Sequence, residues 1–364
     1  MQSSLPTPKL AILQLAFPVL PILSVVLIAV TASNSVHAAT LRSPWTEKPV
    51  TETKSPFPCL NLAPIPADLT MEGFYRLDDP THSQIDPVRQ AAYTAAAAPV
   101  KDDATKIVSE ADAYRTTGSH RAAFCVIQQI YSLAQQHSMT GHMSSNQASY
   151  VQGWVAGAIA IAWLKVQGSG IPSATQRTAV ADWLLAIGKQ TRAYYEAHLG
   201  KGDAANNHLY WAGLELAAIG VTAQNQDDFD WGLNAYTLGV QAIQPDGTLP
   251  REMERAGRAL HYHLYALAPL VLLAEFGEAN GLDLYAQSNG AIHRLESISV
   301  QGLKDPSLFE KTSGTRQEVH LPPTDDAIAW APPYQRRFPN PLLKQFINES
   351  PNLSSLYLGG LAPP

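Results

Sequence analysis

Apolar residues recur along most of the chain with the three- and four-residue spacing of helices that bury one face. This periodicity predicts helices over the ranges 87–98, 100–117, 119–137, 146–167, 173–199, 207–221, 226–243, 255–276 and 280–297. Clusters of proline, glycine and asparagine mark the breaks between them. The alternation typical of strands is not present, so the pattern predicts an all-α protein.

The first part of the chain has the features of a targeting segment. Residues 10–30 are largely apolar and follow Lys9, and residues 36–38 offer a small-residue cleavage site. Pro18 and Pro21 interrupt the apolar run, which disfavours a straight membrane span. We therefore expect residues 1–38 to be a cleaved signal peptide, with an uncleaved anchor as the alternative. Export implies a periplasmic or secreted protein without stable membrane association.

Composition limits the possible partners of the remaining chain. Of the 364 residues, 46% are hydrophobic and 15% are charged, which is enough apolar material for a sizeable core. We expect residues 39–364 to form a single domain that begins with an extended arm over 39–85. The net charge of −6 gives no general attraction to nucleic acid, so a polyanionic partner would need a local basic cleft. The sequence does not indicate an oligomeric state.

Two polar stretches carry the candidate chemistry. Residues 206–211 place two amides, an imidazole, a phenol and an indole at the start of a predicted helix, where free N–H groups attract anions. Farther along lie Arg255, Arg258 and Tyr262. On one continuous helix Arg255 and Tyr262 would share a face two turns apart. A cation beside a phenol suits a carboxylate substrate that is held and deprotonated. The alternative is structural: a helix cap, core aromatics and solvated arginines.

Together these stretches resemble the alginate lyases of polysaccharide lyase family 5. Members carry an Asn-Asn-His-x-Tyr-Trp motif, which matches residues 206–211. About fifty residues later they carry an Arg and an Arg-Ala-Leu-x-Tyr-His segment, which match Arg255 and residues 258–263. The resemblance extends from about Cys59 to residues 358–360. It implies an incomplete (α/α) toroid, or barrel, of paired antiparallel helices around a deep cleft.

The resemblance also implies an activity. Members cleave a 1,4-linked polyuronate by β-elimination, which leaves a 4,5-unsaturated uronate at the new end. Asn207 and Arg255 are expected to neutralise the substrate carboxylate, with His208 assisting. Tyr262 matches the catalytic Tyr of the family, which acts as base and then as acid. His208 would instead be the base for the C5-epimeric uronate.

The expected partner is an anionic polysaccharide, and neither a cofactor nor a metal is expected. Poly-β-D-mannuronate is the preferred substrate. A glucuronate-containing exopolysaccharide is the alternative, because mannuronate and glucuronate differ only at C2. A glycoside hydrolase would need two well-placed carboxylates, and no such pair can be justified among Glu215, Glu252 and Glu254. A non-catalytic polysaccharide-binding protein is the third possibility.

Further candidates for sugar binding flank these motifs. They are Tyr75, Arg76, Gln152, Trp154, Trp211, Arg258, His261 and Tyr334. Tyr75 and Arg76 stand where relatives have a Ser-Lys-Tyr segment in a lid loop. Gln152 and Gly153 stand where relatives commonly carry a cation before the Trp, which raises the question of a polymer other than alginate.

The chain has two cysteines, Cys59 and Cys125, and an exported protein can hold them as a disulfide. Two separate buried thiols are the alternative. Relatives place cysteines at matching points, so the resemblance supports the disulfide.

Overall fold

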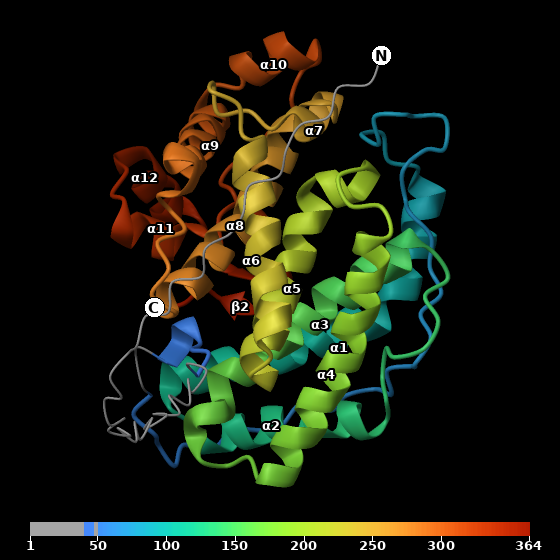
Figure 1. Cartoon of the computed structure of the whole chain (residues 1–364), viewed down its shortest axis with the longest axis vertical. Helices are drawn as coiled ribbons and strands as arrows, with labels where there is room; N and C mark the ends of the chain where they lie inside the picture. The colour runs from blue at the N-terminus through green and yellow to red at the C-terminus, as the bar shows by residue number, and fades with distance from the viewer. Residues whose placement is uncertain (1–39, 47–49) are drawn as a thin grey trace, which may run out of the picture. The chain divides into compact units, whose positions relative to one another are not determined.

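The computed structural model describes residues 40–46 and 50–364, so the expected signal peptide lies outside the described residues. Thr40–Pro364 forms one compact unit. Helices dominate this unit, which confirms the predicted all-α class (Figure 1). Within the described ranges the only strands are β1 (Ser354–Ser355) and β2 (Gly360–Leu361), which pair antiparallel near the C-terminus.

The long helices follow the predicted order. They are α1 (Pro87–Thr117), α2 (His120–Gln135), α3 (Asn146–Val166), α4 (Ala174–Glu196), α5 (Asn207–Ala223), α6 (Gln226–Ala242), α8 (Ala259–Ala279) and α9 (Gln287–Lys304). The short helices are α7 (Pro250–Met253), α10 (Ser307–Ser313), α11 (Ala331–Arg337) and α12 (Pro341–Glu349). Single 3₁₀ turns occur at η1 (Pro44–Thr46), η2 (Gln167–Ser169), η3 (Gly202–Ala205), η4 (Ala256–Arg258), η5 (Asp325–Ala327) and η6 (Leu356–Leu358).

Helix α5 lies at the centre of the packing and contacts α3, α4, α6 and α8 (Figure 1). Helices α3, α5 and α8 are buried along most of their length, as expected of helices that are apolar on all sides. The stretch Ala256–Ala279 has the length and hydropathy of a membrane span, but 89% of its most apolar window is buried inside the fold. Glycines allow α5 and α6 to approach closely: a Cβ on Gly232 would lie 2.5 Å from the carbonyl oxygen of Gly213.

Several predicted boundaries are wrong. Residues 87–117 form one helix instead of two, because the alanine-rich flanks carry α1 through Pro99 despite its missing N–H. Helix α8 begins at Ala259 instead of 255, after the separate turns of α7 and η4. Helix α9 begins at Gln287 instead of 280, because residues 280–286 form a connecting loop. The pattern did not predict α10, α11 and α12, which have seven to nine residues each.

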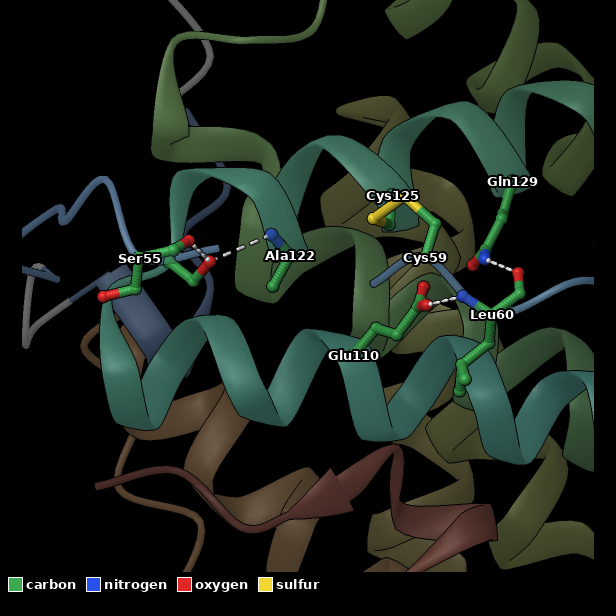
Figure 2. The surroundings of a disulfide bond; sticks show 8 residues. Ser55, Cys59, Leu60, Glu110, Ala122, Cys125 and Gln129 are labelled. Carbon is green, nitrogen blue, oxygen red and sulfur yellow. Dashed lines mark hydrogen bonds between the residues drawn. A yellow bond between two sulfur atoms is a disulfide. The ribbon is translucent and has the colours of Figure 1, made fainter. Parts of the chain in front are cut away.

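The N-terminal arm is fastened to the helices by a disulfide between Cys59 and Cys125 of α2 (Figure 2). The next residue adds two hydrogen bonds: the Leu60 N–H donates to Glu110 Oε1 at 2.6 Å, and its carbonyl accepts from Gln129 at 2.7 Å. The arm is therefore held against both α1 and α2. This attachment fixes the start of the segment that continues toward the polar site described next.

Candidate active site

Helix α5 presents Asn207 at its first turn. Asn206 caps the helix and accepts a hydrogen bond from the His208 N–H at 2.9 Å. Asn207 is completely buried, and its backbone N–H and side-chain Nδ2 donate to the two carboxyl oxygens of Glu252, at 2.7 and 2.8 Å. Burial raises the pKa of Glu252 to about 7. The amide of Asn207 is thus held in one orientation, and its Oδ1 has no hydrogen-bond partner among the described residues.

Arg255 and Tyr262 lie together, although not on one continuous helix. Arg255 is in the turn between α7 and η4, and Ala256 follows it with φ 47°. The chain then enters α8, whose first turns carry Tyr262. The Arg255 guanidinium lies 3.5 Å from the centre of the Tyr262 ring, and that of Arg258 lies 5.4 Å from it. The expected grouping of two cations with one phenol is therefore present.

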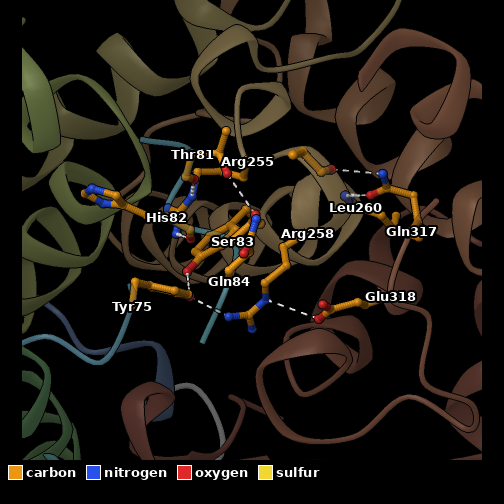
Figure 3. A network of polar contacts seen from close by, with 12 residues as sticks. Tyr75, Thr81, His82, Ser83, Gln84, Arg255, Arg258, Leu260, Gln317 and Glu318 are labelled. Carbon is orange, nitrogen blue, oxygen red and sulfur yellow. Dashed lines mark hydrogen bonds and ion pairs between the residues drawn. The ribbon is translucent and has the colours of Figure 1, made fainter. Parts of the chain in front are cut away.

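The loop between the arm and α1 covers this group (Figure 3). The Tyr75 hydroxyl is hydrogen-bonded to the Tyr262 hydroxyl and accepts a hydrogen bond from Arg258. Arg255 donates to the carbonyl oxygens of Thr81 at 3.0 Å and His82 at 2.6 Å. Burial, and next the charge of Tyr262, raise the pKa of Tyr75, so its hydroxyl stays protonated. In this structure the loop is thus hydrogen-bonded to the guanidinium of Arg255 and to the hydroxyl of Tyr262.

His208 is a neutral imidazole in an aromatic stack. Its ring lies 4.0 Å from that of Tyr150 and 5.9 Å from that of Trp154, centre to centre. Burial, and next the charge of Arg255, lower the pKa of His208 to about 3. Its Nδ1 is buried, and nothing in the described part of the chain hydrogen-bonds to it. Asp203 fixes the stack by accepting a hydrogen bond from the Tyr150 hydroxyl at 2.5 Å.

Three predicted sugar-binding side chains surround this group. Trp154 packs against Tyr357 with ring centres 5.0 Å apart, and Trp211 packs against Tyr265 at 4.9 Å. Trp211 is buried, so it supports the neighbouring aromatic side chains, which form an aromatic wall beside the site, and offers little surface to a sugar. The ring of His261 stands edge-on to that of Tyr262 at 5.0 Å.

Three other candidates are placed differently from the prediction. Arg76 points into solvent and pairs with Asp78, because Tyr75 lies in an extended segment bridged to Ile85, in which successive side chains point to opposite sides. Gln152 is buried, and its amide nitrogen donates a hydrogen bond to the Met139 carbonyl at 2.7 Å. Tyr334 is buried in a separate aromatic cluster, where its hydroxyl contacts His293 at 2.6 Å. Within the described part of the chain, none of these three side chains is hydrogen-bonded to or stacked on Asn207, Arg255 or Tyr262.

Sequence reasoning missed the supporting role of Glu252. It considered this carboxyl only as one of three unpaired candidates for hydrolysis. Its partner Asn207 lies 45 positions earlier in the chain, and no local pattern connects the two. Tyr150 and Tyr357 were also missed as parts of the aromatic wall, because an isolated Tyr in an apolar stretch looks like any core residue.

Comparisons with known proteins give the family. The alginate lyase family model matches residues 70–309. A polysaccharide lyase from Stenotrophomonas maltophilia is 35% identical over 276 residues, which cover 75% of this chain and 80% of that protein. An alginate lyase from Pseudomonas syringae pv. syringae is 32% identical over 225 residues, which cover 61% of this chain and 59% of that protein.

Solved structures share the fold. Alginate lyase A1-III from Sphingomonas species A1 matches with a TM-score of 0.68 at 23% identity, over 88% of this chain and 87% of that one. A variant of alginate lyase A1-III complexed with a tetrasaccharide matches with a TM-score of 0.70 at 22% identity, over 89% of each chain. The shared fold is the predicted (α/α) toroid. From its motifs, its fold and these matches, the chain belongs to the alginate lyase family and is a polysaccharide lyase.

Proposed function

We propose that this lyase cleaves a 1,4-linked polyuronate by β-elimination and that poly-β-D-mannuronate is its preferred substrate. The observation that carries the proposal is the contact of the Arg255 guanidinium with the Tyr262 ring at 3.5 Å, beside an oriented Asn207. The names of the relatives and the tetrasaccharide bound to a structural neighbour support an anionic polysaccharide as substrate.

The first task of the site is to stabilise charge. Removal of the C5 proton places negative charge on the adjacent carboxylate, and fixed donors aimed at that charge give the largest catalytic effect. Arg255 supplies a guanidinium that can bind both carboxylate oxygens. Asn207 is oriented before substrate arrives, because one hydrogen of its Nδ2 is already bonded to Glu252, and the second hydrogen is the donor proposed for the carboxylate. Together they take the role expected for them from the sequence.

Tyr262 performs the proton transfers in the proposed reaction. Its phenolate oxygen takes the C5 proton, and the electrons of the C5–H bond form the C4–C5 double bond. The bond from C4 to O4 breaks, and O4 receives a proton from Tyr262, which restores the phenolate. Two guanidinium groups lie at the Tyr262 ring, so positive charge is close to the phenolate of the proposed reaction and attracts it.

His208 gives the site a second potential base. It is neutral over the physiological pH range and has an unpartnered Nδ1. On the C5 epimer, where the proton faces the opposite side of the ring, this nitrogen would accept it. On mannuronate, a ring N–H of His208 would instead donate to the carboxylate.

Substrate entry requires the loop over 73–86 to move. Tyr75 and the carbonyls of Thr81 and His82 occupy the groups of Arg255 and Tyr262 that the reaction needs. A sugar carboxylate would replace the two carbonyl oxygens at Arg255 with a charged acceptor, which forms the stronger hydrogen bonds. The loop therefore acts in this proposal as a lid that substrate displaces or slides beneath.

The carboxylates give no support to the hydrolase alternative. Glu252 is completely buried and bonded to Asn207, whereas Glu254 is at the surface with Arg251. Glu215 is bonded to Thr191. None of the three forms the opposed acid and base that glycoside hydrolysis uses.

A panel of purified polyuronates tests the proposal. Poly-mannuronate, poly-guluronate and poly-glucuronate are incubated with the full chain, and the ultraviolet absorbance of the unsaturated product is followed. The fastest increase is expected on poly-mannuronate. Faster cleavage of poly-glucuronate would shift the assignment to the second candidate substrate, and cleavage without the absorbance would indicate hydrolysis. A protein that binds these polymers without cleaving any would be a binding protein.

A further inference from the structure

A separate cavity lies between α3, α4 and α5, next to the stack on His208. Its volume is about 220 Å³. Tyr150 and Trp154, which contact His208, also line the cavity, and Glu215 of α5 lines it from the core side. The proposed mechanism uses neither the cavity nor Glu215. A volume below the roughly 300–1,000 Å³ of sites for drug-sized ligands suits a single sugar ring.

Glu215 is an incompletely bonded acid in this cavity wall. Its side chain is buried, with 1% of the residue exposed. One carboxyl oxygen accepts a hydrogen bond from the Thr191 hydroxyl at 3.0 Å, while Oε2 has no partner within the described residues. A Cβ built on Gly153 would lie 2.6 Å from Oε2, so glycine leaves this oxygen uncovered on that side. A buried polar atom without a partner is rare and is usually explained by a bound water or a ligand.

The cavity also lacks compensating positive charge. The described residues that line it include neither Lys nor Arg. A sugar carboxylate placed here would lose its hydration without an ion pair in return. A sugar hydroxyl has no such penalty, since it donates to an ionised carboxyl and accepts from a protonated one. Burial raises the pKa of Glu215 to about 8, so both forms occur near neutral pH.

We propose that this cavity is a subsite for one uncharged, hydroxyl-bearing sugar unit of the substrate chain, with Glu215 as its hydrogen-bond partner. The proposal rests on the proposed function and makes it more specific. It extends the expected substrates from poly-mannuronate, which contains only uronate units, to polymers in which neutral sugars accompany the uronate units. The elimination occurs at the uronate beside Tyr262, and the neutral unit binds on the His208 side.

Two small glycosides test the subsite without turnover. Methyl β-D-mannopyranoside and its uronate are titrated against the full chain, with binding followed by saturation-transfer NMR. The variant Glu215→Leu removes the hydrogen bond, and Glu215→Gln keeps both a donor and an acceptor. We expect Glu215→Leu to lower the affinity for the neutral glycoside about tenfold, and Glu215→Gln to lower it by less than about threefold. Binding of the uronate is expected to change by less than about threefold in both variants.

A matched control is Glu296→Leu, which removes a buried carboxyl bonded to Asn340 outside the cavity and is expected to leave both titrations unchanged. If Glu215→Leu does not fold, Gly153→Ala serves as the second variant, because its methyl group would cover Glu215 Oε2. This variant should lower the affinity for the neutral glycoside and leave the affinity for the uronate unchanged. The proposal is overturned if the neutral glycoside binds equally well to the Leu variant, or to the Ala variant in its place. An equal loss of affinity for the neutral glycoside and for the uronate would also overturn it.

The two proposals fail in different ways. If no polyuronate gives the ultraviolet-absorbing product, β-elimination is wrong, and the glycoside titrations still decide whether the cavity binds a neutral sugar. If elimination occurs but the titrations show no effect of Glu215, the subsite alone is wrong.

Discussion

The carboxyl group of Glu252 binds both nitrogen atoms of Asn207, the backbone N–H at 2.7 Å and the side-chain amide at 2.8 Å. One acidic side chain thus supports the first turn of α5 and orients a proposed catalytic amide. Because both residues are completely buried, water cannot replace either hydrogen bond. Catalysis should therefore depend on a carboxyl that is not expected to touch the substrate.

Replacing Glu252 with Gln tests this dependence. One acceptor oxygen becomes an NH₂ group that faces a donor of Asn207, which should destabilise the fold by about 1–3 kcal/mol. We expect kcat to fall about 10–100-fold with a smaller change in KM, since the oriented donor acts on charge that develops in the transition state. Ultraviolet rate assays and thermal unfolding measure both effects. Glu254→Gln, at the exposed neighbouring carboxyl, is the control and should match the unaltered protein.

Replacing Tyr262 with Phe should remove the proposed acid and base. We expect kcat to fall about 10²–10⁴-fold while the fold and substrate binding are retained. Initial rates from ultraviolet absorbance, together with equilibrium binding of an oligomannuronate, separate chemistry from binding. Tyr265→Phe removes the hydroxyl of a partly buried ring on the same helix and should lose far less activity. Similar losses in the two variants would contradict the assignment.

The lid contacts predict a change in loop opening. Tyr75→Phe removes the hydroxyl that meets both Tyr262 and Arg258. Each lost hydrogen bond contributes about 0.5–1.5 kcal/mol, so amide exchange over 73–86 should accelerate about tenfold. Hydrogen exchange detected by mass spectrometry measures this directly. Arg76→Ala, in the same loop but exposed to solvent, should leave the exchange rates unchanged.

The disulfide predicts a measurable share of the stability. Cys59 and Cys125 are 66 positions apart, and closing a loop of that length stabilises a protein by about 4 kcal/mol in the chain-entropy model. The double variant Cys59→Ser with Cys125→Ser should lower the free energy of unfolding by roughly this amount. Urea unfolding followed by circular dichroism provides the measurement. A change below about 1 kcal/mol would show that hydrogen bonds such as those of Leu60 hold the arm without the covalent link.

Glu215 predicts how stability depends on pH. Its pKa rises from 4.5 to about 8 on burial, so the folded protein binds this proton more tightly than the unfolded chain. The associated stabilisation is complete below about pH 4.5 and is lost as the pH rises toward 8. Because one pKa unit corresponds to about 1.4 kcal/mol, the loss over this range should reach a few kcal/mol.

The variant Glu215→Gln has no titratable carboxyl at this position, so the decline in its stability between pH 4.5 and 8 should be less steep. Urea unfolding at intervals across this range measures the slope. Part of the slope should remain, because Glu252 has a raised pKa of about 7. An unchanged slope in the Gln variant would show that Glu215 does not change its protonation on unfolding.

Local sequence patterns predicted the long helices because each buries a face that repeats every three to four residues. They failed where two local preferences compete, as at Pro99, whose alanine-rich surroundings keep α1 continuous. They also failed for short helices such as α10, whose seven residues contain too few repeats. The end of one helix and the start of the next depend on contacts with distant residues, which a local pattern does not contain.

The candidate site shows the same limit. Spacing suggested that Arg255 and Tyr262 would meet through one helix, and they meet instead through a turn at Ala256. The positions of Glu252, Tyr150 and Tyr357 depend on which helices pack together. The motif could therefore name the reacting groups, but not the side chains that orient them.

The C-terminal strand pair connects to the aromatic wall through a buried ammonium group. Lys165 of α3 donates to Asp112 and to the carbonyl of Gly359, both at 2.5 Å. Two residues before Gly359, Tyr357 packs on Trp154, which also belongs to α3. Proteolytic trimming of this tail would therefore remove the Tyr357 ring from Trp154 and leave the buried Lys165 ammonium with Asp112 as its remaining partner. Damage far from the reacting phenol would still reach the sugar path.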